Sequence, residues 1–289
     1  MNKNTLIAVA MMIAAMLLLP TGDGVGKYLG SVTLYSAGFL AWSRYIVGLA
    51  TVTPIALANG AFSGLGRDFV IRQAIRGFFN AGAIFCILKA VKTVPLADSY
   101  GAFFIAPVVA TLLAFFVLKE KVRLVEWVAV ILGFVGVLLV VQPSGQLSTG
   151  LIWALASGTC FACFMISTRW SAGTAPPLAQ LFGQLFFGFL FTIPLGLSDL
   201  LAHGIVLPAI VIAMGLISAL ANLLQILAFA QARAAFLAPF VYSQIIAATS
   251  ISWFFFGDQL NGLAMIGLAI IFSTGFLKIQ PRSRPSGPA

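Results

Sequence analysis

Long apolar stretches, with few charged residues inside them, alternate with short polar breaks along the whole chain. Each stretch is close to the about 20 residues that a helix needs to cross a bilayer, and about twice as long as the alternating segments of a membrane β-barrel. Turn-forming residues mark the breaks, as at Asn59-Gly60 and Gln142-Pro143. The pattern predicts an all-α integral membrane protein with ten transmembrane helices. The stretches lie at about 5–29, 33–58, 72–93, 95–118, 124–142, 149–169, 177–198, 206–230, 234–257 and 262–280.

Composition agrees with this pattern and excludes several other classes of protein. The 289 residues are 61% hydrophobic and 8% charged, with a mean hydropathy of +1.08. A soluble domain carries about 25% charged residues. Ten spans leave no room for a separate soluble domain. The net charge of +9 is not gathered into basic blocks, so we expect the lipid bilayer as a partner and no nucleic acid.

The basic residues predict the orientation in the membrane, because cytoplasmic loops are enriched in Lys and Arg. With the N-terminus inside, twelve basic residues fall at cytoplasmic ends and three at outer ends, with Arg44 left out as lying within a span. Both termini are therefore predicted to be cytoplasmic. The inner set is Lys3, Arg67, Arg72, Arg76, Lys119, Lys121, Arg123, Arg169, Arg233, Lys278, Arg282 and Arg284. The outer set is Lys27, Lys89 and Lys92.

The chain contains an internal repeat. Residues 87–143 align with residues 226–281 at an offset of about 138, so that Gln142-Pro143 falls on Gln280-Pro281. We interpret residues 1–143 and 144–281 as two five-helix repeats and 282–289 as a disordered tail. Because five is odd, the second repeat must be inverted relative to the first. Inverted repeats are typical of secondary transporters, which bind substrate near the midplane between the copies.

Several stretches resemble a known family, the drug/metabolite transporter superfamily, and in particular its ten-helix EamA-type members. They are residues 41–46 with a single Arg, residues 90–99 followed by Pro107, and the acidic helix ends 118–121 and 256–259. The last has Asp258 where the family usually has Glu. The resemblance implies a secondary transporter, most similar to bacterial exporters of aromatic and other neutral amino acids.

Uncharged polar residues inside the spans are the main candidates for substrate binding. They fall on the third and eighth and the fourth and ninth helices, which are mates in the repeat, so they could converge on one midplane cavity with aromatic walls. The alternative is that each bonds a neighbouring helix, at about 0.6–2 kcal/mol apiece. The predicted substrate-binding set is Phe78, Phe79, Asn80, Tyr100, Phe104, Asn222, Gln225, Tyr242 and Gln244.

Ionisable residues and prolines within spans form a second set of candidates, with structural or gating roles. Pro20 predicts a bend or unwound turn in the first helix. Asp23 lies four residues before Lys27, which favours a solvated ion pair at a helix end over a role in a cavity. Arg44 could hold a substrate carboxylate, but we favour a structural arginine bonded to helix-end carbonyls.

Pro107 and Pro239 are candidate kinks in the fourth and ninth helices, and could act as hinges. The remaining carboxylates fall near helix ends, so the sequence indicates no proton-coupling residue at mid-depth. Neither a nucleotide-binding loop nor a set of metal ligands is apparent, and we expect no cofactor and no metal.

The sequence therefore predicts a secondary transporter in the bacterial inner membrane, working as a monomer by alternating access around a midplane cavity. Export of aromatic and other neutral amino acids is the leading function, and multidrug or other metabolite export is the alternative. A membrane-embedded enzyme or a channel is less favoured, because neither a catalytic cluster nor a continuous polar stripe is present in the sequence.

Overall fold

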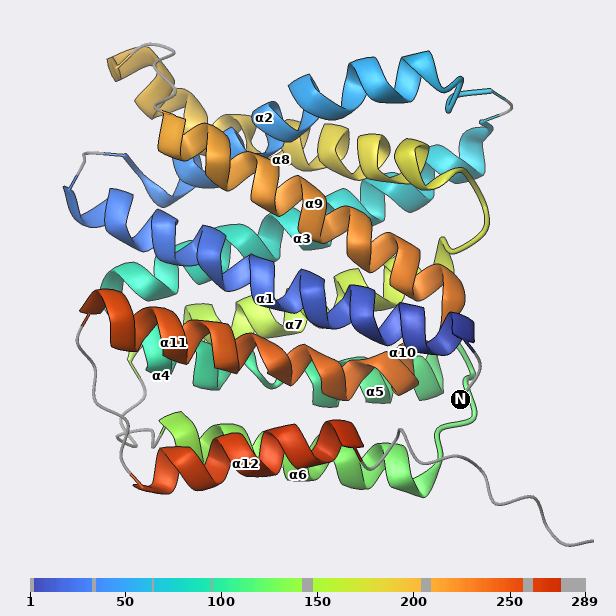
Figure 1. The fold of residues 1–289 in the computed structure, drawn as a ribbon. Helices are drawn as coiled ribbons and strands as arrows, with labels where there is room; N and C mark the ends of the chain where they lie inside the picture. Colours follow the sequence, from blue (N-terminus) through green and yellow to red (C-terminus); the bar gives the residue numbers. More distant parts are fainter. Residues whose placement is uncertain are drawn as a thin grey trace, which may run out of the picture.

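The structure, a computed structural model, describes residues 3–32, 35–63, 65–94, 96–141, 148–203, 209–256 and 262–276. Within these ranges every regular element is a helix, and the helices lie side by side as a bundle (Figure 1). The elements are α1 (Lys3–Val32), α2 (Ala37–Ala58), α3 (Arg67–Thr93), α4 (Leu96–Phe103), α5 (Ala106–Phe116), α6 (Leu124–Val141), α7 (Thr149–Trp170), α8 (Pro177–His203), α9 (Ala209–Gln231), α10 (Ala234–Leu237), the 3₁₀ helix η1 (Ala238–Ser243), α11 (Gln244–Phe256) and α12 (Gly262–Phe276).

The all-α membrane fold predicted from the apolar pattern is confirmed. Eight helical segments of the described chain are long and apolar enough to cross a membrane, and a shorter apolar helix covers Leu124–Leu139. The fourth and ninth predicted spans are interrupted helices, referred to below as broken rods. The fourth consists of α4 and α5, and the ninth consists of α10, η1 and α11. With α12 as the last, the order follows the ten predicted stretches. The third helix begins at Arg67, five residues before the predicted start.

The two broken rods have their interruptions beside the predicted kink residues. Pro107 lies in the first turn of α5, directly after the junction at Phe104 and Ile105. There the amide of Ile105 donates to the carbonyl of Ala102, three residues back, rather than four. Pro239 lies in the first turn of η1. Proline cannot donate a backbone hydrogen bond, so each of these positions favours a local break.

The first helix is continuous, so of the predicted bend or unwound turn at Pro20 the unwound turn is wrong. Helix α1 continues through Pro20 to Val32. The Thr21 hydroxyl donates to the carbonyl of Leu18 within the same turn. Proline is tolerated inside a transmembrane helix when side chains, neighbouring helices or water satisfy the freed backbone groups.

Helices from the two parts of the sequence are interlaced. Helix α1 packs along α9, α3 along α7, α2 along α8, and α6 along α12. Small residues allow the closest approaches. A Cβ added at Gly158 on α7 would lie 2.2 Å from the carbonyl oxygen of Phe103, and one added at Gly38 on α2 would lie 2.2 Å from that of Leu195. A Cβ added at Gly136 on α6 would lie 2.9 Å from the carbonyl oxygen of Gly267 on α12.

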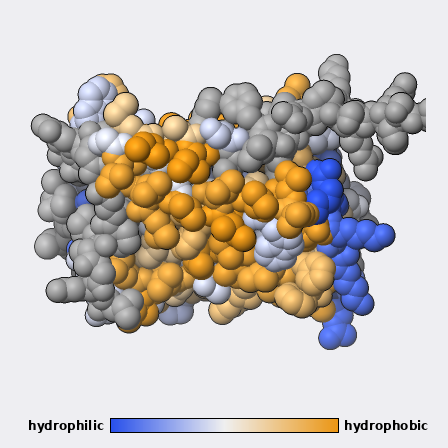
Figure 2. Space-filling model, turned by 90° about the horizontal axis from the view of Figure 1, so that it is seen from below, coloured by the Kyte–Doolittle hydropathy of each residue, from blue (hydrophilic) through white to orange (hydrophobic). Residues whose placement is uncertain are grey.

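The outer surface presents large apolar side chains. In Figure 2 the coloured part of one face is mostly hydrophobic, with strongly hydrophilic residues at one edge. On α6 and α12 the exposed side chains include Ile131, Val135, Leu263, Met265 and Ile266. An apolar face of this extent fits contact with lipid and not with water.

Candidate functional site

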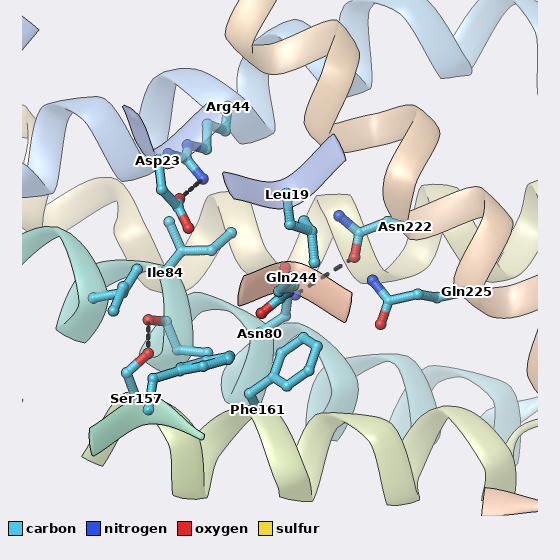
Figure 3. A pocket seen from close by; sticks show the side chains of 13 residues that line it. Leu19, Asp23, Arg44, Asn80, Ile84, Ser157, Phe161, Asn222, Gln225 and Gln244 are labelled. Atoms are coloured by element: carbon cyan, nitrogen blue, oxygen red, sulfur yellow. Dashed lines mark hydrogen bonds and ion pairs between the residues drawn. The ribbon is translucent and has the colours of Figure 1, made fainter. Parts of the chain in front are cut away.

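A small pocket lies inside the bundle, where helices from both parts of the sequence meet (Figure 3). Its volume is about 40 Å³. That is room for a few water molecules, well below the about 300 Å³ or more of a typical ligand site. The pocket is therefore too small for such a ligand in this structure. Its lining residues are Leu19, Asp23, Arg44, Asn80, Ala83, Ile84, Ile87, Phe103, Ser157, Phe161, Asn222, Gln225 and Gln244.

An ion pair between α1 and α2 forms one wall. Arg44 Nη1 lies 2.7 Å from Asp23 Oδ1, and Arg44 Nη2 donates to the carbonyl of Gly22 at 2.9 Å. The Tyr100 hydroxyl donates to the other carboxylate oxygen of Asp23 at 2.7 Å. The side chains of Arg44 and Asp23 are only 2% and 12% exposed. Asp23 is thus a buried carboxylate beside the pocket, and its recorded partners are Arg44 and Tyr100.

This arrangement corrects the interpretation of Asp23 as one half of a solvated pair with Lys27 at a helix end. The hypothesis that Arg44 is a structural residue agrees with its hydrogen bond to the carbonyl of Gly22 and its ion pair with Asp23. Its Nε has no hydrogen-bond partner among the described residues, and its guanidinium lines the pocket.

Amide side chains form the opposite wall. Asn80 on α3 accepts from the Tyr45 hydroxyl at 2.6 Å, and its amide nitrogen lies 3.5 Å from Asn222 Oδ1 on α9. Gln225 lies one turn further along α9 and is 1% exposed, yet neither its Nε2 nor its Oε1 has a partner within the described structure. Gln244 Oε1 is equally unpartnered. A buried polar atom without a partner is costly, so these amides are groups that a bound molecule could satisfy.

Apolar side chains complete the lining. Phe103 from α4 and Phe161 from α7 have ring centroids 5.3 Å apart. Leu19, Ile84 and Ile87 lie around them. The pocket therefore combines amide hydrogen-bonding groups with a small aromatic and aliphatic surface, as small-molecule sites usually do.

Four of the nine residues predicted to bind substrate line this pocket, namely Asn80, Asn222, Gln225 and Gln244. The other five lie elsewhere. Tyr100 does not line the pocket, but its hydroxyl donates a hydrogen bond to Asp23, which does. Phe104 and Tyr242 are fully buried and their rings contact each other at a tilted angle, with ring centroids 5.8 Å apart.

Tyr242 is held by packing and by a hydrogen bond from its hydroxyl to the carbonyl of Val130, at 3.0 Å. Phe78 is 55% exposed and packs against Phe79 and Phe191 at the outside of the bundle. The expectation that Phe78 walls the cavity is therefore wrong. Neither Phe78 nor Phe79 lines the pocket. Helical phase decides this, since Phe78 points away from the face that carries Asn80.

Sequence reasoning missed a buried arginine that does not line the pocket but is linked to Asn222 in its lining through Gln184. Arg76 was assigned to a cytoplasmic helix end, but it is the tenth residue of α3 and has no exposed surface. Its guanidinium donates to Thr168 Oγ1 at 3.3 Å and to Gln184 Oε1 at 2.7 Å. It also donates to Gln73 Oε1 and to the backbone carbonyl of Gln180. Gln184, a polar residue in an apolar stretch, was the available signal.

A second polar cluster, outside the pocket, joins the α5–α6 connection to the later helices. Glu120 accepts from Arg169 Nε at 3.3 Å and from the backbone amides of Ala234 and Ala235, at 3.2 and 3.1 Å. Glu126 accepts from Arg233 Nη2 at 2.7 Å. These contacts fix the start of α10 against the acidic helix end that the sequence singled out.

A multi-helix membrane bundle with a small, partly polar pocket between its helices fits the architecture of a membrane transporter. Comparison with known proteins identifies the family. The chain matches the EamA-like transporter family over residues 6–142 and again over 148–277, and it belongs to that family.

Its relatives transport different metabolites. The chain is 23% identical to a riboflavin transporter of Vibrio cholerae, over 80% of this chain and 79% of that protein. It is 24% identical to the pseudopaline exporter CntI of Pseudomonas aeruginosa (77% and 80% covered) and 22% identical to an S-adenosylmethionine uptake transporter of Rickettsia bellii (86% and 85% covered). A solved structure of 18% identity shares the fold, with a TM-score of 0.71 over 94% of this chain and 96% of that one.

Proposed function

We propose that the protein is a secondary transporter that exports aromatic and other neutral amino acids across the bacterial inner membrane by alternating access. In this proposal both termini are cytoplasmic, the protein acts as a monomer, and residues 1–143 and 144–281 are inverted repeats. Two family matches of similar length support the repeat. With Arg76 removed from the cytoplasmic set, the basic bias is still eleven against three.

The observation that carries the proposal is the set of unpartnered amide atoms in the pocket. Gln225 offers a donor and an acceptor, and Gln244 offers an acceptor. An amino acid presents a carboxylate, which accepts, and an ammonium group, which donates. A neutral aromatic side chain would lie against Phe103 and Phe161. The pocket must widen to admit it, which alternating access requires in any case.

A second candidate substrate is a planar nitrogen heterocycle. The donor and acceptor of one amide group can pair with a neighbouring acceptor and donor on such a ring edge. The names of relatives that transport riboflavin and S-adenosylmethionine favour including this class. The shared fold and pocket would then serve export or uptake of a larger metabolite.

Transport by the purified protein in liposomes tests the proposal. Uptake of labelled Phe, Trp, Met, Thr and Ala is compared with uptake of riboflavin and S-adenosylmethionine, with and without a proton gradient. We expect saturable uptake of the aromatic amino acids. Uptake of a heterocycle alone would reject the amino-acid assignment and favour the second candidate.

A pair of variants on α9 tests the site. Gln225→Leu removes both free amide atoms from the pocket, and we expect at least a tenfold loss of uptake, equivalent to about 1.4 kcal/mol. Gln231→Leu is the matched control, because Gln231 lies on the same helix but is exposed and bonds only the backbone of its own helix in the recorded contacts. Equal uptake by the two variants would place the substrate elsewhere.

A further inference from the structure

The buried guanidinium of Arg76 carries a charge that its surroundings do not neutralise. Its hydrogen-bond acceptors are the neutral oxygens of Gln73, Thr168, Gln180 and Gln184. The Phe164 ring adds only a weak contact, 6.0 Å from the guanidinium carbon. Hydrogen bonds to neutral groups satisfy the N–H donors but leave the net charge in place.

Each carboxylate whose side chain the structure describes forms its ion pair with an arginine other than Arg76. Asp23 pairs with Arg44, Asp68 with Arg72, Glu120 with Arg169, and Glu126 with Arg123 and Arg233. Charged side chains within a membrane domain normally pair with each other or mark a substrate path. A buried charge without its counter-charge is strongly unfavourable. Within the described residues the charge of Arg76 therefore has no carboxylate partner.

A hydrogen-bonded chain connects this charge to the pocket. Gln184 accepts from Arg76 through Oε1 and donates through Nε2 to Asn222 Oδ1 at 2.7 Å. Asn80 lies one helical turn beyond Arg76 on α3, and both Asn80 and Asn222 line the pocket. Only the amide of Gln184 and one turn of α3 separate the guanidinium from the lining.

The ion pair on the other wall does not offer an equivalent charge. Arg44 lines the pocket, but Asp23 neutralises it at 2.7 Å. An anion that approached Arg44 would meet the carboxylate of Asp23 as well. An anion that approached Arg76 would displace only neutral oxygens.

We propose that Arg76 binds an anionic group of the substrate, a carboxylate in the first instance, and that the oxygens of Gln73 and Gln184 occupy its donors when no substrate is bound. This specificity determinant rests on the proposed transport function and makes its recognition chemistry more definite. When the pocket widens, the amide of Gln184 turns aside and the carboxylate takes its place on Nη2. The charge of Arg76 then selects molecules with a carboxylate over their uncharged amides.

Binding of two probes of nearly equal shape tests this without any assumption about transport. Phenylacetate and phenylacetamide differ in the charge of one group. Their dissociation constants are measured from ligand-induced thermal stabilisation of the purified full-length protein, at constant ionic strength. We expect phenylacetate to bind about tenfold or more tightly than phenylacetamide.

Variants assign the preference to one side chain. Arg76→Gln removes the charge, and the preference should fall to about one, whereas Arg76→Lys should keep part of it. Arg72→Gln is the matched control. Arg72 lies one turn earlier on α3, pairs with Asp68 and stacks on Trp170 with its guanidinium carbon 3.9 Å from the ring centre, so its loss should leave the preference unchanged.

Each outcome supports or overturns the proposal. Equal binding of the two probes by the unaltered protein, or binding of neither, overturns it even if Arg76→Gln fails to fold. A preference that survives in Arg76→Gln also overturns it. If labelled amino acids are not transported but the preference depends on Arg76, the amino-acid function fails while the anion site stands. If amino acids are transported but the protein shows no preference for phenylacetate, the anion site fails while the amino-acid function stands.

Discussion

Replacing Asp23 by Asn tests whether the pair on the pocket wall is a buried ion pair. The substitution keeps the size of the side chain and removes its charge. Arg44 would then be left inside the bundle with the carbonyl of Gly22 and a neutral amide as its partners. The Tyr100 hydroxyl would lose a charged acceptor at the same time.

The exposures of the two side chains, 2% for Arg44 and 12% for Asp23, set the expected magnitude. Removing one partner of a buried pair costs about 3–5 kcal/mol, because the other charge stays buried without compensation. A solvent-exposed pair contributes only about 0–1 kcal/mol. An ordinary neutral bond between membrane helices averages about 0.6 kcal/mol. The structure therefore predicts a loss of about 3 kcal/mol or more for Asp23→Asn.

The free energy of unfolding can be measured by titrating SDS into mixed micelles of the purified protein. A double-mutant cycle with Arg44→Gln isolates the pair from other effects of each substitution. We expect the double variant to be more stable than the sum of the two single losses predicts. A loss below about 1 kcal/mol for Asp23→Asn, with a coupling energy near zero, would refute the burial argument and return Asp23 to a solvated position.

Three further substitutions follow from the packing. Tyr242→Phe should cost about 1 kcal/mol in unfolding free energy and leave liposome uptake unchanged, because the hydroxyl bonds a backbone carbonyl; lost uptake would restore Tyr242 to the site. Gly158→Ala should cost about 1–3 kcal/mol by the same titration, since its Cβ would meet the carbonyl of Phe103 at 2.2 Å, and a neutral effect would contradict that approach. Glu120→Gln should cost about 1–3 kcal/mol by weakening the bonds from Arg169 and the start of α10, and unchanged stability would count against the cluster.

The helices could be predicted from the sequence because the bilayer imposes a simple rule. Each span needs a long apolar run, and turn residues mark its ends, so the element order follows directly from the pattern. Pro107 and Pro239 also marked the broken rods. Pro20 did not mark a break, because whether a proline interrupts a helix depends on what its neighbours can satisfy, and the sequence does not show those neighbours.

The site was predictable only where a residue type alone carried the signal. Asn80, Asn222, Gln225 and Gln244 are polar residues in apolar stretches, which is costly enough to indicate a tertiary role. Asp23 was misjudged because the nearest opposite charge in sequence is Lys27. The partner in the structure, Arg44, lies 21 residues away on another helix. A choice between a local and a distant partner requires the packing of α1 against α2.

The arrangement of the helices also limits how such a pocket can open. The closest neighbours of α1 and α3 are α9 and α7, so each early helix is packed against a late one. Separating residues 1–143 from 144–281 as two rigid blocks would break both of these interfaces, including the bond from Ser157 to the carbonyl of Ala83. Packed interfaces change between discrete arrangements and do not deform continuously. If the protein works by the alternating access proposed above, opening would therefore disrupt less packing with the mixed pairs α1–α9 and α3–α7 moving as units, and the breaks beside Pro107 and Pro239 would take up the change in backbone angle.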